Sequence, residues 1–418
     1  MDITQRRRTA APPRGGGRLA VVDGLRLCAA LAVAMFHYTA INSVAFWGDR
    51  APFGRLAHLT AYGWLGVELF FMISGFVISL SAWGRTAGGF ARSRLIRLFP
   101  AYWAAVLLTA AVAVLVPTFG LPVNARQVVV NLTMLNEPLK VTSVDLSFWT
   151  LWAEARFYLL FGLLVWAGLS RGRVLWFGYA WLIGAVISVN SGMPVLVTVL
   201  QPAYAPYFVA GIGFFLIHRF GSDLRHWGLV GLAWALAIYS VGARVEHSAR
   251  TEHRPLSVTV AMLIVTGFFL VLAVVAVGWT ARIRWRWLTT AGLLTYPFYL
   301  LHQRVGGTLL QHFHFLPRYG ALGAVVGVML VVAWLSHRFL ERPLAGYLHR
   351  RLAPGAVDVV RGARSGVLSG SGAAAVSGVA AVSGAGGHSE AVAIAAEEPA
   401  PGAVGAWANT VTQRTTSP

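Results

Sequence analysis

An apolar stretch near the N-terminus carries two ionisable side chains that could do chemistry. The stretch DGLRLCAALAVAMFHY, residues 23–38, contains Arg26 and, eleven positions later, His37. On a helix this spacing is about three turns plus roughly 20°, so the two residues lie on one face, about 16 Å apart along the axis. Ionisable groups at membrane depth cost roughly 2.5–3.5 kcal/mol to insert and usually face a cavity or one another. The alternative for His37 is a structural histidine bonded to a neighbouring carbonyl.

A third costly charge is Glu154, in the apolar run FWTLWAEARFYLLF. Glu154 lies about two helical turns after the start of its run, and His37 lies at a similar depth before the end of its own run. If the two runs cross the membrane in opposite directions, both residues lie at the same level. We therefore predict that the carboxylate pairs with the imidazole, fixes its tautomer and makes it a better base. A local salt bridge with Arg156 is disfavoured, because residues two apart on a helix point about 200° away from each other.

Two arginines in FARSRLIRLFPAYW could bind an anion. Arg94 and Arg97 are three residues apart and share a helical face. Two guanidinium groups held together suit a phosphate, because each presents forked donors to anionic oxygens. The alternative is that both are ordinary positively charged anchors beside a membrane-spanning helix.

Other features of the sequence are weaker candidates for a catalytic or binding role. In GWLGVELFFMISGFVIS, Glu68 begins an apolar run, and Ser74 with Gly75 favours close helix packing over a backbone opened for a ligand. His302 could line an acceptor pocket, although we interpret it as an interfacial histidine. Cys28 is the single cysteine, and we interpret it as packing. We expect no metal site, because the loop VEHSARTEHRP has no ligand spacing or supporting shell; its candidate ligands are Glu246, His247, Glu252 and His253.

The composition indicates an all-α integral membrane protein. Hydrophobic residues make up 57% of the 418 positions, charged residues 12%, and the mean hydropathy is +0.64. The 34 Lys and Arg exceed the 15 Asp and Glu, but they form no stripe and lie between apolar runs, so we exclude a nucleic-acid partner. The partner is the lipid bilayer, and nothing in the sequence predicts an oligomeric state. The Arg- and Ala-rich composition is typical of a high-GC bacterium.

Ten apolar runs are long enough to cross about 30 Å of hydrocarbon. They are residues 21–44, 62–82, 101–118, 148–168, 174–190, 200–217, 227–243, 257–279, 288–306 and 320–340. With a cytoplasmic N-terminus, the inner segments hold twenty Lys and Arg and the outer loops nine. We predict a bundle of ten transmembrane helices over residues 19–345, with both termini cytoplasmic in a bacterial cell membrane. We expect a basic disordered arm over 1–18 and a disordered Gly/Ala/Ser-rich tail over 354–418.

These residues resemble the membrane acyltransferase-3 family of bacterial enzymes that acylate sugars, surface glycans and macrolides. The resemblance runs from Val22 to Pro343. It includes DGLR with Arg26 and His37, GVELFFMISGF, the block Phe90-Arg94-Arg97-Pro100, SFWTLWAEARFYLLF with Glu154, LTYPFYLLH ending at His302, and ERP at residues 341–343. Glu68 stands where relatives often have Asp, which keeps the charge.

The resemblance implies a cytoplasmic acyl-CoA donor, a hydroxyl acceptor on a sugar or glycan, and essential roles for Arg26, His37, Arg94 and Arg97. It implies no permanently bound cofactor. We expect the phosphates of CoA to bind Arg94 and Arg97 and the thioester to pass Arg26 and reach His37. Oriented by Glu154, His37 would then deprotonate the acceptor hydroxyl. The rival hypotheses are a proton-coupled transporter or flippase, against which no pair of matching broken helices is visible, and a non-catalytic membrane partner.

Overall fold

The structure is a computed structural model that describes residues 19–41, 43–48, 53–116, 123–313 and 315–352. The expected arm over 1–18 and tail over 354–418 lie outside these residues. Helices make up most of the described part of the chain, which contains no strand. One compact unit ends at Gly346, and the sections below concern that unit.

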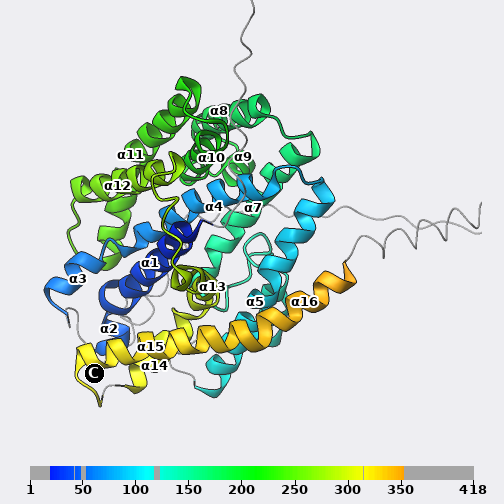
Figure 1. Cartoon of the computed structure of the whole chain (residues 1–418). Coiled ribbons are helices and arrows are strands. Elements are labelled where there is room, and N and C mark those ends of the chain that lie inside the picture. Colours follow the sequence, from blue (N-terminus) through cyan, green and yellow to red (C-terminus); the bar gives the residue numbers. More distant parts are fainter. Residues whose placement is uncertain (1–18, 42, 49–52, 117–122, 314, 353–418) are drawn as a thin grey trace, which may run out of the picture. The chain divides into compact units, whose positions relative to one another are not determined.

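The predicted spans correspond to ten main helices (Figure 1). They are α1 (Ala20–Phe36), α4 (Gly66–Ala82), α5 (Ala87–Leu115), α7 (Trp149–Trp166), α8 (Arg171–Val189), α10 (Ala205–Phe220), α11 (Leu224–Glu252), α12 (Val258–Ala276), α13 (Arg286–Leu301) and α15 (Arg318–Ser336). Within the described residues, nine segments are long and apolar enough to cross a membrane. The tenth, α13, has only 16 residues and is about 24 Å long. The prediction of an all-α membrane bundle is confirmed.

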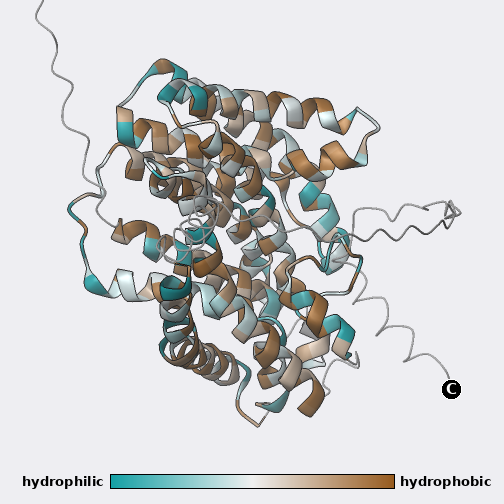
Figure 2. Cartoon of the chain, turned by 90° about the vertical axis from the view of Figure 1, so that its right-hand side faces the viewer, coloured by the Kyte–Doolittle hydropathy of each residue, from teal (hydrophilic) through white to brown (hydrophobic). Residues whose placement is uncertain are grey.

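Shorter elements connect and extend these helices. The α-helical ones are α2 (Ser43–Trp47), α3 (Arg55–Thr60), α6 (Ala125–Leu132), α9 (Pro194–Leu200), α14 (Arg304–His312) and α16 (Arg342–Arg351). The others are the π-helical turns η1 (His37–Ile41) and η4 (His337–Glu341) and the 3-10 turns η2 (Gly63–Leu65) and η3 (Leu146–Phe148). Brown, hydrophobic residues predominate along the long helices in Figure 2.

Two predicted helix boundaries are wrong. The predicted span 101–118 begins fourteen residues earlier, at Ala87, where Thr86 Oγ1 caps the helix by accepting from the Gly89 N–H at 3.2 Å. Arg94 and Arg97 therefore lie inside a continuous helix, and Pro100 is accommodated within it. The predicted loop with four possible metal ligands is mostly helical, because α11 continues to Glu252. Hydropathy misses both extensions, because the helix continues through polar residues.

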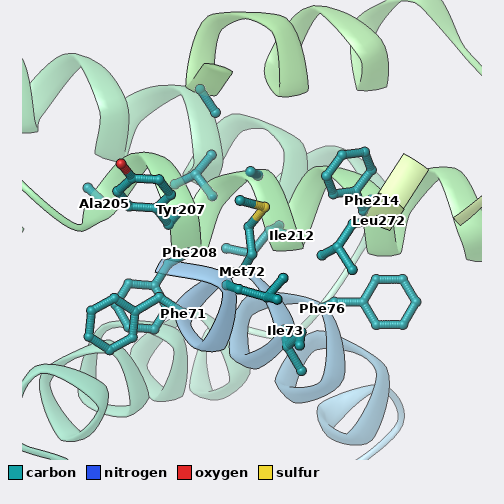
Figure 3. Close-up of a cluster of buried hydrophobic side chains, with 14 of the residues drawn as sticks. Phe71, Met72, Ile73, Phe76, Ala205, Tyr207, Phe208, Ile212, Phe214 and Leu272 are labelled. Atoms are coloured by element: carbon teal, nitrogen blue, oxygen red, sulfur yellow. The ribbon is translucent and has the colours of Figure 1, made fainter. Parts of the chain in front are cut away.

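The core is densest where α4 meets α10. Nearly every residue of α10 is buried, and its aromatic side chains interdigitate with those of α4 (Figure 3). The backbones touch at two glycines: a Cβ on Gly75 would lie 2.1 Å from the Phe208 carbonyl oxygen, and one on Gly211 2.0 Å from the Met72 carbonyl oxygen. The prediction that Gly75 serves close helix packing is confirmed.

Contacts between helix ends show which ends share a side of the bundle. The ends of α1, α11 and α13 lie on one side with the starts of α4, α7 and α10, as the pairs His37–His302, Glu68–Arg244, Tyr204–Arg244 and Trp149–Tyr204 show. The start of α5 and the end of α15 lie on the opposite side. α1 packs against both α4 and α13 (Figure 1), which brings residues near 37, 68 and 300 together.

Candidate active site

His37 and His302 form a hydrogen-bonded pair between α1 and α13. His37 Nδ1 lies 3.0 Å from His302 Nε2, and the ring centroids are 5.1 Å apart. His302 is fully buried, whereas His37 keeps part of its surface accessible. His37 begins the π-helical turn after α1, and His302 directly follows α13. Short π-helical segments occur frequently at functional sites.

The hydrogen bonds of His302 indicate which nitrogen of His37 can act as a base. His302 Nδ1 lies 2.5 Å from the Tyr299 carbonyl oxygen, which can only accept, so this nitrogen carries the proton. In the neutral ring His302 Nε2 is then the acceptor, and His37 Nδ1 donates to it. The His37 ring also hydrogen-bonds the backbone of Val33. We assign the Nε2 lone pair of His37 as the proton acceptor.

A polar network supports His302 from the other side. The Asp145 carboxylate accepts from the Arg304 backbone N–H at 2.9 Å and from the Ser147 hydroxyl at 2.7 Å. Asp145 is buried and acts electrostatically on His302. The Tyr38 hydroxyl donates to the His302 carbonyl oxygen at 2.6 Å. A positive charge gained by His37 would therefore lie near a buried carboxylate, which acts on His302 through space and not through a hydrogen bond.

Glu154 does not form the predicted pair with His37. It accepts from the Ser74 hydroxyl at 2.5 Å, and it also binds the Tyr158 hydroxyl one turn further along α7. His302 holds the place that we expected Glu154 to take. Equal depth puts two side chains at one level of the bundle, but only the packing of the helices decides whether they face each other.

Arg26 belongs to the same group as Glu154. Its guanidinium interacts electrostatically with Arg97, Glu154 and Tyr158. The structure therefore separates the predicted site into two parts: the His37 pair, and an arginine–carboxylate cluster around Arg26. Along α1 the two parts are about 16 Å apart.

Arg94 and Arg97 reach this cluster with different partners. The Arg94 guanidinium lies over the rings of Phe90 and Tyr158, 5.8 and 5.9 Å from their centroids. Arg97 Nη1 lies 3.2 Å from Glu341 Oε1, and His337 Nδ1 contacts the other oxygen of that carboxylate at 2.9 Å. Within the described residues Arg94 forms no ion pair, so its charge is the more available to an anion.

The chain is similar to known acyltransferases. The acyltransferase domain of the acyltransferase-3 family matches residues 19–337. The chain belongs to the acyltransferase-3 family. Acyltransferase MdmB of Streptomyces mycarofaciens is 29% identical over 381 residues, which cover 81% of this chain and 95% of that protein. Protein 2 in picA locus of Rhizobium radiobacter is 34% identical over 119 residues, which cover 27% of this chain and 53% of that protein. No solved structure gives a significant match.

Membership of the acyltransferase-3 family makes the chain a multi-pass membrane acyltransferase. Sequence reasoning missed two residues that the structure places at the site, Asp145 and Tyr158. It named His302 as a residue that could line an acceptor pocket, interpreted it as interfacial, and did not predict its pairing with His37. Asp145 is two positions before Ser147, a spacing typical of a capping residue, and Tyr158 is four positions after Glu154. These local signals could have drawn attention to both residues.

Proposed function

We propose that this acyltransferase moves a short acyl group, acetyl in the first instance, from acyl-CoA to a hydroxyl of a sugar, a surface glycan or a glycosylated metabolite. The hydrogen-bonded His37–His302 pair, with the Nε2 lone pair of His37 assigned as the proton acceptor, carries the proposal. Such a lone pair suits proton abstraction from a hydroxyl.

The donor binds at the arginine cluster. Arg94 and Arg97 take the phosphates of CoA, and Arg97 exchanges its Glu341 contact for a phosphate oxygen. Arg26 lines the route along which the pantetheine arm extends toward His37. In the orientation that the charge distribution predicts, this end of the bundle faces the cytoplasm and both termini lie there.

The reaction is a direct transfer. His37 Nε2 takes the proton of the acceptor hydroxyl while the oxygen of that hydroxyl bonds to the thioester carbonyl carbon. The carbon–sulfur bond then breaks, and the leaving thiolate of CoA recovers the proton from His37. His302 accepts the Nδ1 hydrogen bond throughout, and Asp145 favours the transient positive charge.

Radiolabelled acetyl-CoA supplied to inverted membrane vesicles tests this function. We expect label in a glycan, glycolipid or metabolite fraction from the wild-type chain and none from His37→Ala. Gradient-dependent uptake of label without transfer would instead support a carrier. Mass spectrometry of surface glycans and secreted metabolites, with and without the gene, should then reveal the acceptor as a species that shifts by one acyl group.

A further inference from the structure

A second polar cluster lies on the same side of the bundle as His37, outside the reaction described above. Glu68, at the start of α4, forms an ion pair with Arg244 of α11, and the carboxylate is completely buried. The Arg244 guanidinium also lies over the rings of Trp64 and Tyr204, 5.1 and 5.2 Å from their centroids. Two aromatic side chains thus flank a neutralised charge.

Several buried polar atoms in this part of the molecule have no hydrogen-bond partner among the described residues. They are Trp64 Nε1, Arg244 Nη1 and, three residues before Tyr204 in the chain, both side-chain polar atoms of Gln201. The rest of the Arg244 guanidinium pairs with Glu68 and hydrogen-bonds the Tyr207 hydroxyl. Gln201 is 3% exposed and adopts the left-handed conformation at φ 51°. It lies at the turn into α10, where its carbonyl accepts from the Tyr204 N–H at 2.8 Å. An unpaired buried polar group costs about 1–3 kcal/mol, so a cluster of them indicates a ligand that supplies the missing partners.

The cluster is one aromatic layer away from the histidine pair. Trp64 packs against the small buried cluster of Phe36, Ala40 and Ala61, and the ring centroid of Phe36 is 5.1 Å from that of His37. Glu68 acts electrostatically on Tyr299, whose ring centroid is 5.2 Å from that of His302. A molecule held at the cluster would therefore lie one aromatic layer from the proposed base, on the opposite side of the bundle from the start of α5, which carries Arg94.

We propose that this cluster, defined by Trp64, Glu68, Gln201, Tyr204 and Arg244, is the acceptor subsite and binds a sugar ring. The proposal rests on the acyl transfer proposed above. Aromatic faces suit the apolar face of a sugar, and the indole N–H, guanidinium and amide groups suit its hydroxyls. Because Glu68 neutralises Arg244, the subsite favours an uncharged sugar over an anionic one.

The test uses the full chain in lipid nanodiscs and measures saturation-transfer NMR with the methyl glycosides of glucose, galactose, mannose and N-acetylglucosamine. We expect at least one of them to bind. Trp64→Phe and Gln201→Met should each weaken binding roughly 3- to 10-fold, because each removes hydrogen-bonding groups. Gln201→Met should leave the melting temperature unchanged or raise it, because an unpaired buried amide is replaced by an apolar chain of similar size. A merely structural role would not separate binding from stability in this way.

The matched control is Trp234→Phe, ten residues before Arg244 on α11, where the indole N–H donates to Thr266 Oγ1 at 3.1 Å. It should bind the glycosides as the wild type does. The subsite is overturned if none of the four glycosides binds, or if the Trp64 and Gln201 variants bind them as tightly as the wild type does. Glycoside binding without acetyl transfer from acetyl-CoA in the vesicle assay would instead refute the proposed reaction and leave the sugar site standing.

Discussion

The Nδ1 atom of His37 lies 3.0 Å from the Nε2 atom of His302, although 265 positions separate the two residues. The contact joins the π-helical turn after α1 to the residue that follows α13. Together with the contact from His302 Nδ1 to the Tyr299 carbonyl oxygen, it sets the direction of a short hydrogen-bond chain. That direction makes Nε2 of His37 the basic atom, and each catalytic prediction below depends on it.

Replacing His37 should abolish transfer and leave donor binding intact. A general base contributes typically 10²–10⁴-fold, so His37→Ala should reduce kcat by about that factor. Acyl-CoA binding, measured by isothermal titration on the protein in nanodiscs, should remain near the wild-type value because the arginine cluster is about 16 Å away along α1. Acyl transfer at the wild-type rate by His37→Ala would contradict the mechanism.

His302 should act as a positioning residue. His302→Phe removes the acceptor of the His37 Nδ1 hydrogen bond, and we expect kcat to fall roughly 10- to 150-fold with little change in KM. His302→Gln keeps an acceptor oxygen and should recover part of the loss. Identical losses in both variants, accompanied by lower melting temperatures, would indicate packing alone.

The arginine cluster should determine donor affinity. Arg94→Ala should weaken acyl-CoA binding roughly 10- to 150-fold, because a charge-assisted hydrogen bond contributes about 1.5–3 kcal/mol. Arg97→Ala should have a smaller effect, because Arg97 must first give up Glu341. The control is Arg85→Ala, an exposed arginine just before α5. If all three variants bound acyl-CoA equally well, the donor site would have to lie elsewhere.

The close contact between α4 and α10 should be intolerant of a single methyl group. Gly211→Ala places a Cβ 2.0 Å from a backbone oxygen, so we expect a loss of about 1–3 kcal/mol or more and a lower melting temperature. Gly267→Ala on α12, where a Cβ meets nothing within 4 Å, should keep or raise the melting temperature. Equal melting temperatures for the two variants would argue against this packing.

Asp223 should make stability depend on pH at the acidic end. The Arg225 backbone N–H, which donates to its Oδ1 at 2.9 Å, and the Arg171 guanidinium hold the pKa of Asp223 below its ordinary value. The ionised form therefore stabilises the fold fully above the unfolded pKa of about 3.9, and this stabilisation disappears as the pH falls through the folded pKa. Asp223→Asn should melt lower than the wild type at neutral pH, and the difference should shrink at acidic pH. A constant difference would contradict this account.

The sequence by itself determined the class of fold and the chemistry available. The long apolar runs require membrane-length helices, because the backbone must satisfy its own hydrogen bonds in lipid. Helical periodicity also put Arg26 and His37 on one face of α1, since residues along one helix have a fixed angular relation. A charge at membrane depth marked Glu154 as a site candidate, and helical spacing marked Arg94 and Arg97.

Only the tertiary structure decided which of these residues meet. Glu154 hydrogen-bonds Ser74 and interacts electrostatically with Arg26, while His302 hydrogen-bonds His37. Likewise Glu341 became the partner of Arg97 from 244 positions away. Periodicity fixes the face of a helix on which a residue lies. It does not fix which of the other helices that face meets, because this depends on how all the helices pack together.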